Sequence, residues 1–196
     1  LSTNPISFAA PRRAADPILV DMTTSVCAEG KVRIAHNKGE MLPEGRIIDH
    51  DGNPSVDPED FVGNPPGAIL PFGGPVAYKG YCLSMVVEIL GGALGGQGTA
   101  NGETVMQSNG LHLTVYNIGH FVEEDDFHAE LESLIKHVHT SRVDPHIGEI
   151  LLPGEPEYRT GRQRQQEGIP IDDTTWARIG EAARGLGLNP DAWPQG

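Results

Sequence analysis

A chain of 196 residues can form one sizeable hydrophobic core and is short for two domains. Its 27 acidic against 14 basic residues give a formal charge of −13, which argues against a nucleic-acid-binding protein and is typical of a soluble one. No apolar run reaches the length of a membrane span, and two cysteines are too few for a disulfide scaffold. We therefore expect a cytoplasmic protein with buried, reduced thiols and no membrane partner.

The first predicted strand covers residues 18–20, three apolar residues that end at Asp21. This carboxylate is followed by Met22, Thr23, Thr24 and Ser25, so an acceptor lies beside hydroxyl donors. Asp21 has two compatible roles there, as the N-cap of a following helix or as a ligand contact. Residues 26–36 are predicted to be helical, although Gly30 weakens that helix.

Residues 37–69 are predicted to consist mainly of loops, because glycine and proline interrupt nearly every short segment. Within them, residues 49–53 (Asp-His-Asp-Gly-Asn) look like the start of a calcium loop. That pattern requires Gly at its sixth position and Glu at its twelfth, where this chain has Pro54 and Asp60. We therefore predict a surface turn and no metal site.

A glycine- and proline-rich loop leads to Lys79, and Gly80 begins an apolar run. Apolar residues recur at helical intervals from residue 83 to residue 94, which predicts a helix with one buried face. Lys79 then lies just before or in the first turn, where the helix dipole disfavours a cation. A bound phosphate or carboxylate would compensate for this, whereas the alternative is a surface lysine in a loop.

The glycine-rich residues 91–102 match neither standard nucleotide-binding loop, so we expect closely packed small residues and then a mobile loop. Residues 111–118 alternate apolar and polar side chains and predict a strand. An amphipathic helix is expected over residues 127–138, and a second buried strand over residues 147–153. A final helix is expected to begin near Trp176, with its apolar side chains inward.

Seven short motifs stand in order along the chain: Thr3-Asn-Pro-Ile-Ser-Phe-Ala-Ala-Pro11, Asp21-Met-Thr-Thr-Ser25, Gly39-Glu-Met-Leu-Pro-Glu-Gly45, Asp51-Gly-Asn-Pro54, Lys79-Gly-Tyr-Cys-Leu83, Leu152-Pro-Gly-Glu155 and Gly168-Ile-Pro-Ile171. Together they resemble the malate/L-lactate dehydrogenase family of NAD(P)-dependent oxidoreductases, which lies outside the Rossmann class. Each motif alone is weak, but the set is specific and spans essentially the whole chain.

The resemblance implies an α+β fold, a mainly antiparallel sheet flanked by helices, with a non-Rossmann dinucleotide-binding architecture and usually a tight homodimer. It implies NAD or NADP as cofactor and no metal. The residues carried over as cofactor contacts are Asp21, Met22, Thr23, Lys79, Gly80, Gly154 and Glu155. We expect Glu155 to accept hydrogen bonds from ribose hydroxyls, as acidic residues do in other dinucleotide sites.

The implied reaction is hydride transfer that interconverts a small 2-hydroxy acid of the malate or lactate type and its 2-keto acid. Reduction of a cyclic imine carboxylate is the alternative within the family. The rival outside it is a non-catalytic anion- or calcium-binding module, carried by residues 49–53 and Lys79.

The resemblance also has two departures. Tyr78 and Cys82 stand where the family usually has His and Gly, so we expect altered local packing. The family's proton-transferring His and substrate-binding Arg lie in a preceding region that has no match here. Residues 1–196 are thus expected to be a single cofactor-binding portion of a longer oxidoreductase, with 159–196 as a C-terminal extension ending in a helix. We expect that preceding region either on the same polypeptide or on a separate N-terminal segment. Asp21 is the one catalytic candidate in this sequence, and its expected role is to orient the proton-transferring His.

Overall fold

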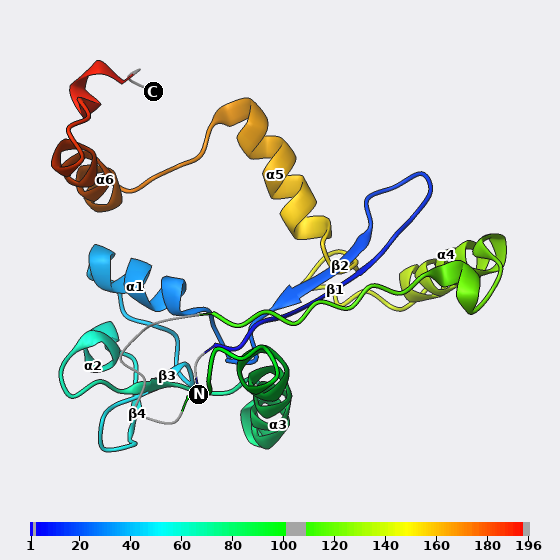
Figure 1. Cartoon of the computed structure of the whole chain (residues 1–196), viewed down its shortest axis with the longest axis horizontal. Helices are drawn as coiled ribbons and strands as arrows, with labels where there is room; N and C mark the ends of the chain where they lie inside the picture. Colours follow the sequence, from blue (N-terminus) through cyan, green and yellow to red (C-terminus); the bar gives the residue numbers. More distant parts are fainter. Residues whose placement is uncertain (2, 101–108, 194–196) are drawn as a thin grey trace. The chain divides into compact units, whose positions relative to one another are not determined.

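The computed structural model describes residues 1, 3–100 and 109–193 (Figure 1). The chain divides into two compact units, Leu1–Pro156 and Glu157–Gly196. Helices are combined with small antiparallel sheets, so the α+β class expected from the sequence is confirmed. Among the described helices, none is both long and apolar enough to span a membrane.

An antiparallel hairpin opens the first unit (Figure 1). Strand β1 (Ile6–Ala10) pairs with β2 (Ile18–Met22), and Asp21 lies opposite Ser7. The strand predicted over residues 18–20 is therefore confirmed, although it extends two residues further. Strand β1 carries no comparable apolar run, and only its pairing with β2 reveals it as a strand.

The hydrophobic core of the first unit lies between one helix and a small sheet. Helix α1 (Glu29–Lys38) falls mostly within the predicted helical segment. The sheet has β3 (Ile47–Ile48) at its centre, with β4 (Pro54–Ser55) and β5 (Ala68–Ile69) antiparallel on either side. The short helix α2 (Pro58–Val62) connects β4 to β5. Three buried residues form the core, namely Cys27, Val32 and Ile47.

A 3-10 turn, η1 (Gly74–Val76), leads into helix α3 (Tyr78–Val87), which continues as the π-helical η2 (Glu88–Ala93). The helix is confirmed, but its predicted buried face is only partly correct. The buried residues are Gly80 and Ser84, whereas Val86 is 47% and Leu94 68% exposed. Gly80 and Ser84 are covered by Phe72 and Asn4, and Leu83 and Val87, which lie at helical spacing from them, are half-buried. Cys82 is exposed on this helix, so only Cys27 fits the expectation of buried thiols.

Small residues after α3 do pack closely, as the sequence predicts. A Cβ added to Gly92 would lie 2.6 Å from the carbonyl oxygen of Gly98, and one added to Gly110 would overlap that of Gly91. A mobile loop is expected at the end of residues 91–102, and of this stretch residues 101 and 102 lie outside the described part of the chain.

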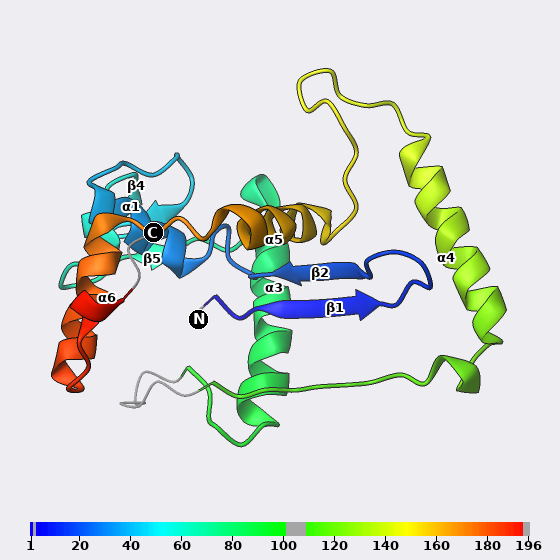
Figure 2. The same ribbon diagram turned by 90° about the horizontal axis from the view of Figure 1, so that it is seen from above.

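The strand predicted over residues 111–118 is wrong for the described structure. Residues 109–117 are extended but pair with no described strand, and η3 (Ile118–His120) follows (Figure 2). Leu111, Leu113 and Val115, the apolar side of the alternation, are 81%, 77% and 83% exposed. The alternation is present in the sequence, but a strand also requires a neighbouring backbone with which to form hydrogen bonds.

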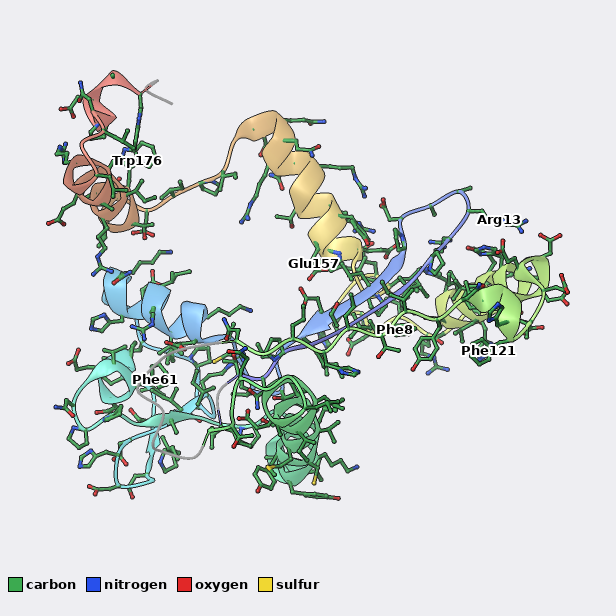
Figure 3. All side chains as sticks on the ribbon, viewed as in Figure 1. Phe8, Arg13, Phe61, Phe121, Glu157 and Trp176 are labelled. Atoms are coloured by element: carbon green, nitrogen blue, oxygen red, sulfur yellow. The ribbon has the colours of Figure 1, made fainter. Side chains whose placement is uncertain are left out.

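Helix α4 (Glu124–His139) is the predicted amphipathic helix, and ion pairs attach it to the loop between β1 and β2. The Arg12 guanidinium donates to both oxygens of Glu132, from Nε at 2.7 Å and from Nη2 at 2.9 Å. Figure 3 shows Arg13 on this loop beside α4, where it pairs with Asp125. The side chain of Arg12 is only 16% exposed, which favours this bidentate pair over an ordinary surface contact.

The Arg12–Glu132 pair predicts a pH-dependent contribution to stability. The hydrogen bond from Arg12 lowers the pKa of Glu132 below its usual value. Since the folded-state pKa is the lower one, the stabilisation is present at neutral pH and is lost as pH falls through that pKa. We expect Glu132→Gln to lower Tm at pH 7, with the difference from the unmodified chain disappearing in acid. Glu130→Gln, an exposed neighbour on the same helix, serves as the control; equal Tm profiles for both variants would contradict the prediction.

The strand predicted over residues 147–153 is also wrong: this segment is a loop, with Ile147 73% exposed and Leu152 buried. Helix α5 (Glu155–Glu167) follows and contains the polar residues 159–167. In the second unit, α6 (Asp173–Gly185) is the predicted final helix, and η4 (Pro190–Ala192) comes after it. Trp176 packs edge-on against Trp193, with ring centroids 5.8 Å apart.

Candidate functional site

The end of β2 presents the first group of expected site residues. Asp21 and Met22 are exposed, and Thr23 is half-buried with its hydroxyl donating to the Ser25 carbonyl at 3.0 Å. The N-cap role considered for Asp21 is wrong, because α1 begins at Glu29. The exposed carboxylate therefore has no helix-capping duty and can contact a ligand.

Phe72 connects this strand end to the start of α3. Its N–H donates to the Thr24 carbonyl at 3.1 Å. A Cβ added to Gly80 would overlap the carbonyl oxygen of Phe72 and lie 2.8 Å from its nitrogen. Gly80 is thus required for a direct backbone contact, and this contact brings the Lys79–Gly80 pair close to the residues that follow β2.

Lys79 is the second residue of α3 and is exposed. The N-cap residue, Ala77, makes no side-chain hydrogen bond to the helix, so the first turn has no side-chain cap. A helix start without a side-chain cap and an exposed cation beside it form an arrangement suited to a phosphate or carboxylate.

The loop that carries Gly154 and Glu155 contacts β2 near the beginning of the strand, at Leu19. The Leu19 N–H donates to the Pro153 carbonyl at 3.0 Å, which places this loop beside the strand. Gly154 is buried and has a φ of +95°, a conformation that favours glycine. The Glu155 carboxylate accepts from the Leu152 N–H through Oε2 at 2.9 Å, so one of its two oxygens holds the loop closed.

Strand β2 therefore joins the three groups of residues expected from the sequence: its own end, the start of α3 and the 152–155 loop. Sequence reasoning missed the residues that make these connections, Phe72 and Thr24. Thr24 is only 1% exposed and its hydroxyl donates to the carbonyls of Thr3 and Asn4. The place of Thr24 inside the second motif was a usable signal, whereas nothing local distinguishes Phe72.

The calcium interpretation of residues 49–53 is not supported. Both oxygens of Asp49 accept hydrogen bonds within the turn, from the N–H groups of Asp51 and Asn53 and from the Asn53 amide. These hydrogen bonds, first of all that from the Asn53 side chain, lower the pKa of Asp49. In the described ranges, no group of three or more His, Cys, Asp or Glu residues could hold a metal ion. The segment is the surface turn predicted from its spacing.

Comparison with known proteins identifies the family of this chain. It belongs to the malate/L-lactate dehydrogenase family, whose sequence model matches residues 1–180. Hydroxycarboxylate dehydrogenase B of Escherichia coli (strain K12) is 38% identical over 192 residues, covering 95% of this chain and 52% of that protein. The Δ1-pyrroline-2-carboxylate/Δ1-piperideine-2-carboxylate reductase of Pseudomonas putida is 37% identical over 180 residues, covering 87% and 49%.

A solved structure supports the fold. Sulfolactate dehydrogenase from Methanocaldococcus jannaschii matches with a TM-score of 0.69 and 33% identity, over 98% of this chain and 55% of that one. The chain spans about half the length of the curated relatives that it matches. The family assigned from the seven motifs is thus confirmed.

Proposed function

We propose that this chain is the cofactor-binding portion of an NAD(P)-dependent oxidoreductase that interconverts a small 2-hydroxy acid and its 2-keto acid. The observation that carries the proposal is the backbone contact of Phe72 with Gly80 and Thr24, which holds Lys79 near the end of β2. Residues 21–23 and Lys79, expected separately as cofactor contacts, thereby belong to one region of the fold. Reduction of a cyclic imine carboxylate is the alternative within the family.

The residues present fit a dinucleotide. Lys79 and the uncapped start of α3 suit its phosphates, and Gly80 leaves no side chain in the way. Glu155 Oε2 accepts a hydrogen bond from the Leu152 N–H, and Oε1 can accept another from a ribose hydroxyl. Both described sheets are antiparallel, in keeping with binding outside a Rossmann domain. When bound, the nicotinamide supplies the hydride chemistry, and the protein supplies binding and orientation. Either NAD or NADP is proposed as the cofactor.

Asp21 has two proposed roles, lining the cofactor and orienting a proton-transferring His from the rest of the enzyme. We expect Asp21→Asn to weaken NADH binding and to reduce turnover by about tenfold or more, because the amide lacks the charge that stabilises an imidazolium. Coenzyme oxidation assays and NADH fluorescence titrations measure both. Asp126→Asn, an exposed residue in the first turn of α4, is the control. Unchanged affinity and turnover in Asp21→Asn would remove it from both roles.

The proposal treats residues 1–196 as one cofactor-binding portion, with residues 159–196 as its C-terminal extension, in a longer enzyme or beside a separate N-terminal segment. A homodimer is proposed as the assembly, and the apolar side chains exposed on α3 and η2, Tyr81 and Ile89 among them, are compatible with an interface. Free cysteines at positions 27 and 82 are compatible with the cytoplasm.

A coenzyme oxidation assay tests the function. The purified chain is mixed with NADH or NADPH and with pyruvate, oxaloacetate, glyoxylate or a cyclic imine carboxylate. Substrate-dependent oxidation supports the dehydrogenase, and the preferred substrate separates the keto acid from the imine hypothesis. A change in NADH fluorescence without turnover supports an isolated cofactor-binding portion. Neither signal, together with stabilisation by calcium or a small anion, would favour the binding module instead.

A further inference from the structure

Asn4 joins the beginning of the β1–β2 hairpin to helix α3. Its amide donates to the Ser84 carbonyl at 3.2 Å, to the Ser84 hydroxyl at 3.1 Å and to Glu88 Oε2 at 2.8 Å. Its φ is +37°, and it is the one non-glycine residue with a positive φ in the described ranges. Asparagine tolerates this conformation better than most residues, but the conformation persists only where surrounding contacts enforce it.

The same residue also holds the chain just beyond β2. The Thr24 hydroxyl donates to the Asn4 carbonyl at 3.0 Å, and Thr24 is almost completely buried. The Thr24 carbonyl accepts from the Phe72 N–H, and Phe72 in turn contacts Gly80. The residues after β2 are therefore tied to α3 at two points, near Gly80 through Phe72 and near Ser84 through Asn4.

Glu88 extends this connection. Its Oε2 accepts from Asn4, and its Oε1 accepts from the Ala100 N–H at 2.6 Å. One carboxylate thus holds both the start of β1 and the chain beyond η2 against the same helix. Two attachment points along α3 restrict its rotation about either one, so together they set the direction in which its first turn faces.

We propose that Asn4 and Glu88 are positioning residues: their hydrogen bond sets the position of Asp21–Thr23 relative to Lys79 and thereby the affinity for the dinucleotide, although neither residue contacts it. The inference rests on the proposed function, since the two groups it positions are the proposed cofactor contacts. It adds a pair of residues that none of the expected site assignments contained.

An exchange of charge between the two partners tests the proposal. In Asn4→Asp, two carboxylates face each other, and we expect NADH affinity to fall about tenfold. In Asn4→Asp combined with Glu88→Gln, the amide and the carboxylate change places. The amide introduced by Glu88→Gln can then donate to the new carboxylate and still accept from Ala100. The Ser84 hydroxyl can donate to that carboxylate too, but the Ser84 carbonyl loses its donor. We therefore expect partial rescue, an affinity clearly above that of Asn4→Asp and below that of the unmodified chain. Rescue by the double variant is a result that general destabilisation would not produce.

Hydrogen exchange gives a second readout that needs no cofactor. The N–H groups of Thr24 and Phe72 should exchange faster in Asn4→Asp and recover protection in the double variant. Asn117→Ala, which removes another asparagine cap at η3, is the control and should leave both N–H groups unchanged. Unchanged exchange in Asn4→Asp, or no recovery in the double variant, would overturn the positioning role. An unmodified chain that binds no NADH would instead refute the proposed function, whatever the exchange rates.

Discussion

Gly80→Ala is expected to destabilise the chain by about 2–3 kcal/mol, as overpacking against an unyielding neighbour does. The added Cβ would lie 2.8 Å from the nitrogen of Phe72 and closer still to its carbonyl oxygen, and real Cβ atoms essentially never approach another heavy atom within 3.0 Å. Because the clash is with backbone, relief requires α3 and the Phe72 segment to move apart. Urea unfolding should show a lower midpoint, and NADH binding should weaken with it, since Lys79 moves away from β2.

Gly30→Ala is the matched control. Gly30 is also close to the start of a helix, but nothing lies within 4 Å of the Cβ that alanine would add. Alanine there should stabilise the chain by about 0.5–1 kcal/mol, because it restricts the unfolded state without a clash. If both alanine variants raised the urea midpoint, the close approach of Phe72 to Gly80 would be contradicted.

Lys79→Ala is expected to weaken NADH binding by about 10- to 100-fold, the range for loss of a hydrogen bond from a charged group. Lys79 is exposed at an uncapped helix start, so its removal disturbs little of the fold and Tm should hardly change. Fluorescence titration at two salt concentrations adds a second test. Affinity of the unmodified chain should fall with salt, whereas that of Lys79→Ala should fall less.

Lys31→Ala provides the comparison, because Lys31 is an exposed lysine in the first turn of α1. Its removal changes the net charge by the same amount, so it accounts for any general electrostatic effect on an anionic ligand. Equal losses of affinity in the two variants would show that Lys79 acts only through net charge. A loss confined to Lys79→Ala would support its direct role.

The sequence predicted those elements whose signals are local. Residues 18–20, 127–138 and the stretch after Lys79 carry apolar periodicities that match β2, α4 and α3. The seven motifs identified the family, which the comparison confirms over residues 1–180. These properties depend on side chains near one another along the chain, so a reading of neighbouring residues captures them.

The failures share one cause. Residues 111–118 have the alternation of a strand but lack a described partner, and α3 buries Gly80 and Ser84 while Val86 stays exposed. Which face of a helix is buried, and whether an extended segment pairs, depends on what lies beside it in space.

For this protein the sequence alone determined the family, the helices α1, α3, α4 and α6, and the residue types of the candidate site, but not helix α5. The tertiary structure decided how those residues are connected: Phe72 against Gly80, Thr24 beneath the end of β2, and Asn4 across to Ser84 and Glu88. Those contacts join positions up to 84 residues apart, and no local pattern records them. The physical reason is that a hydrogen bond or a close backbone approach is set by the folded path of the whole chain.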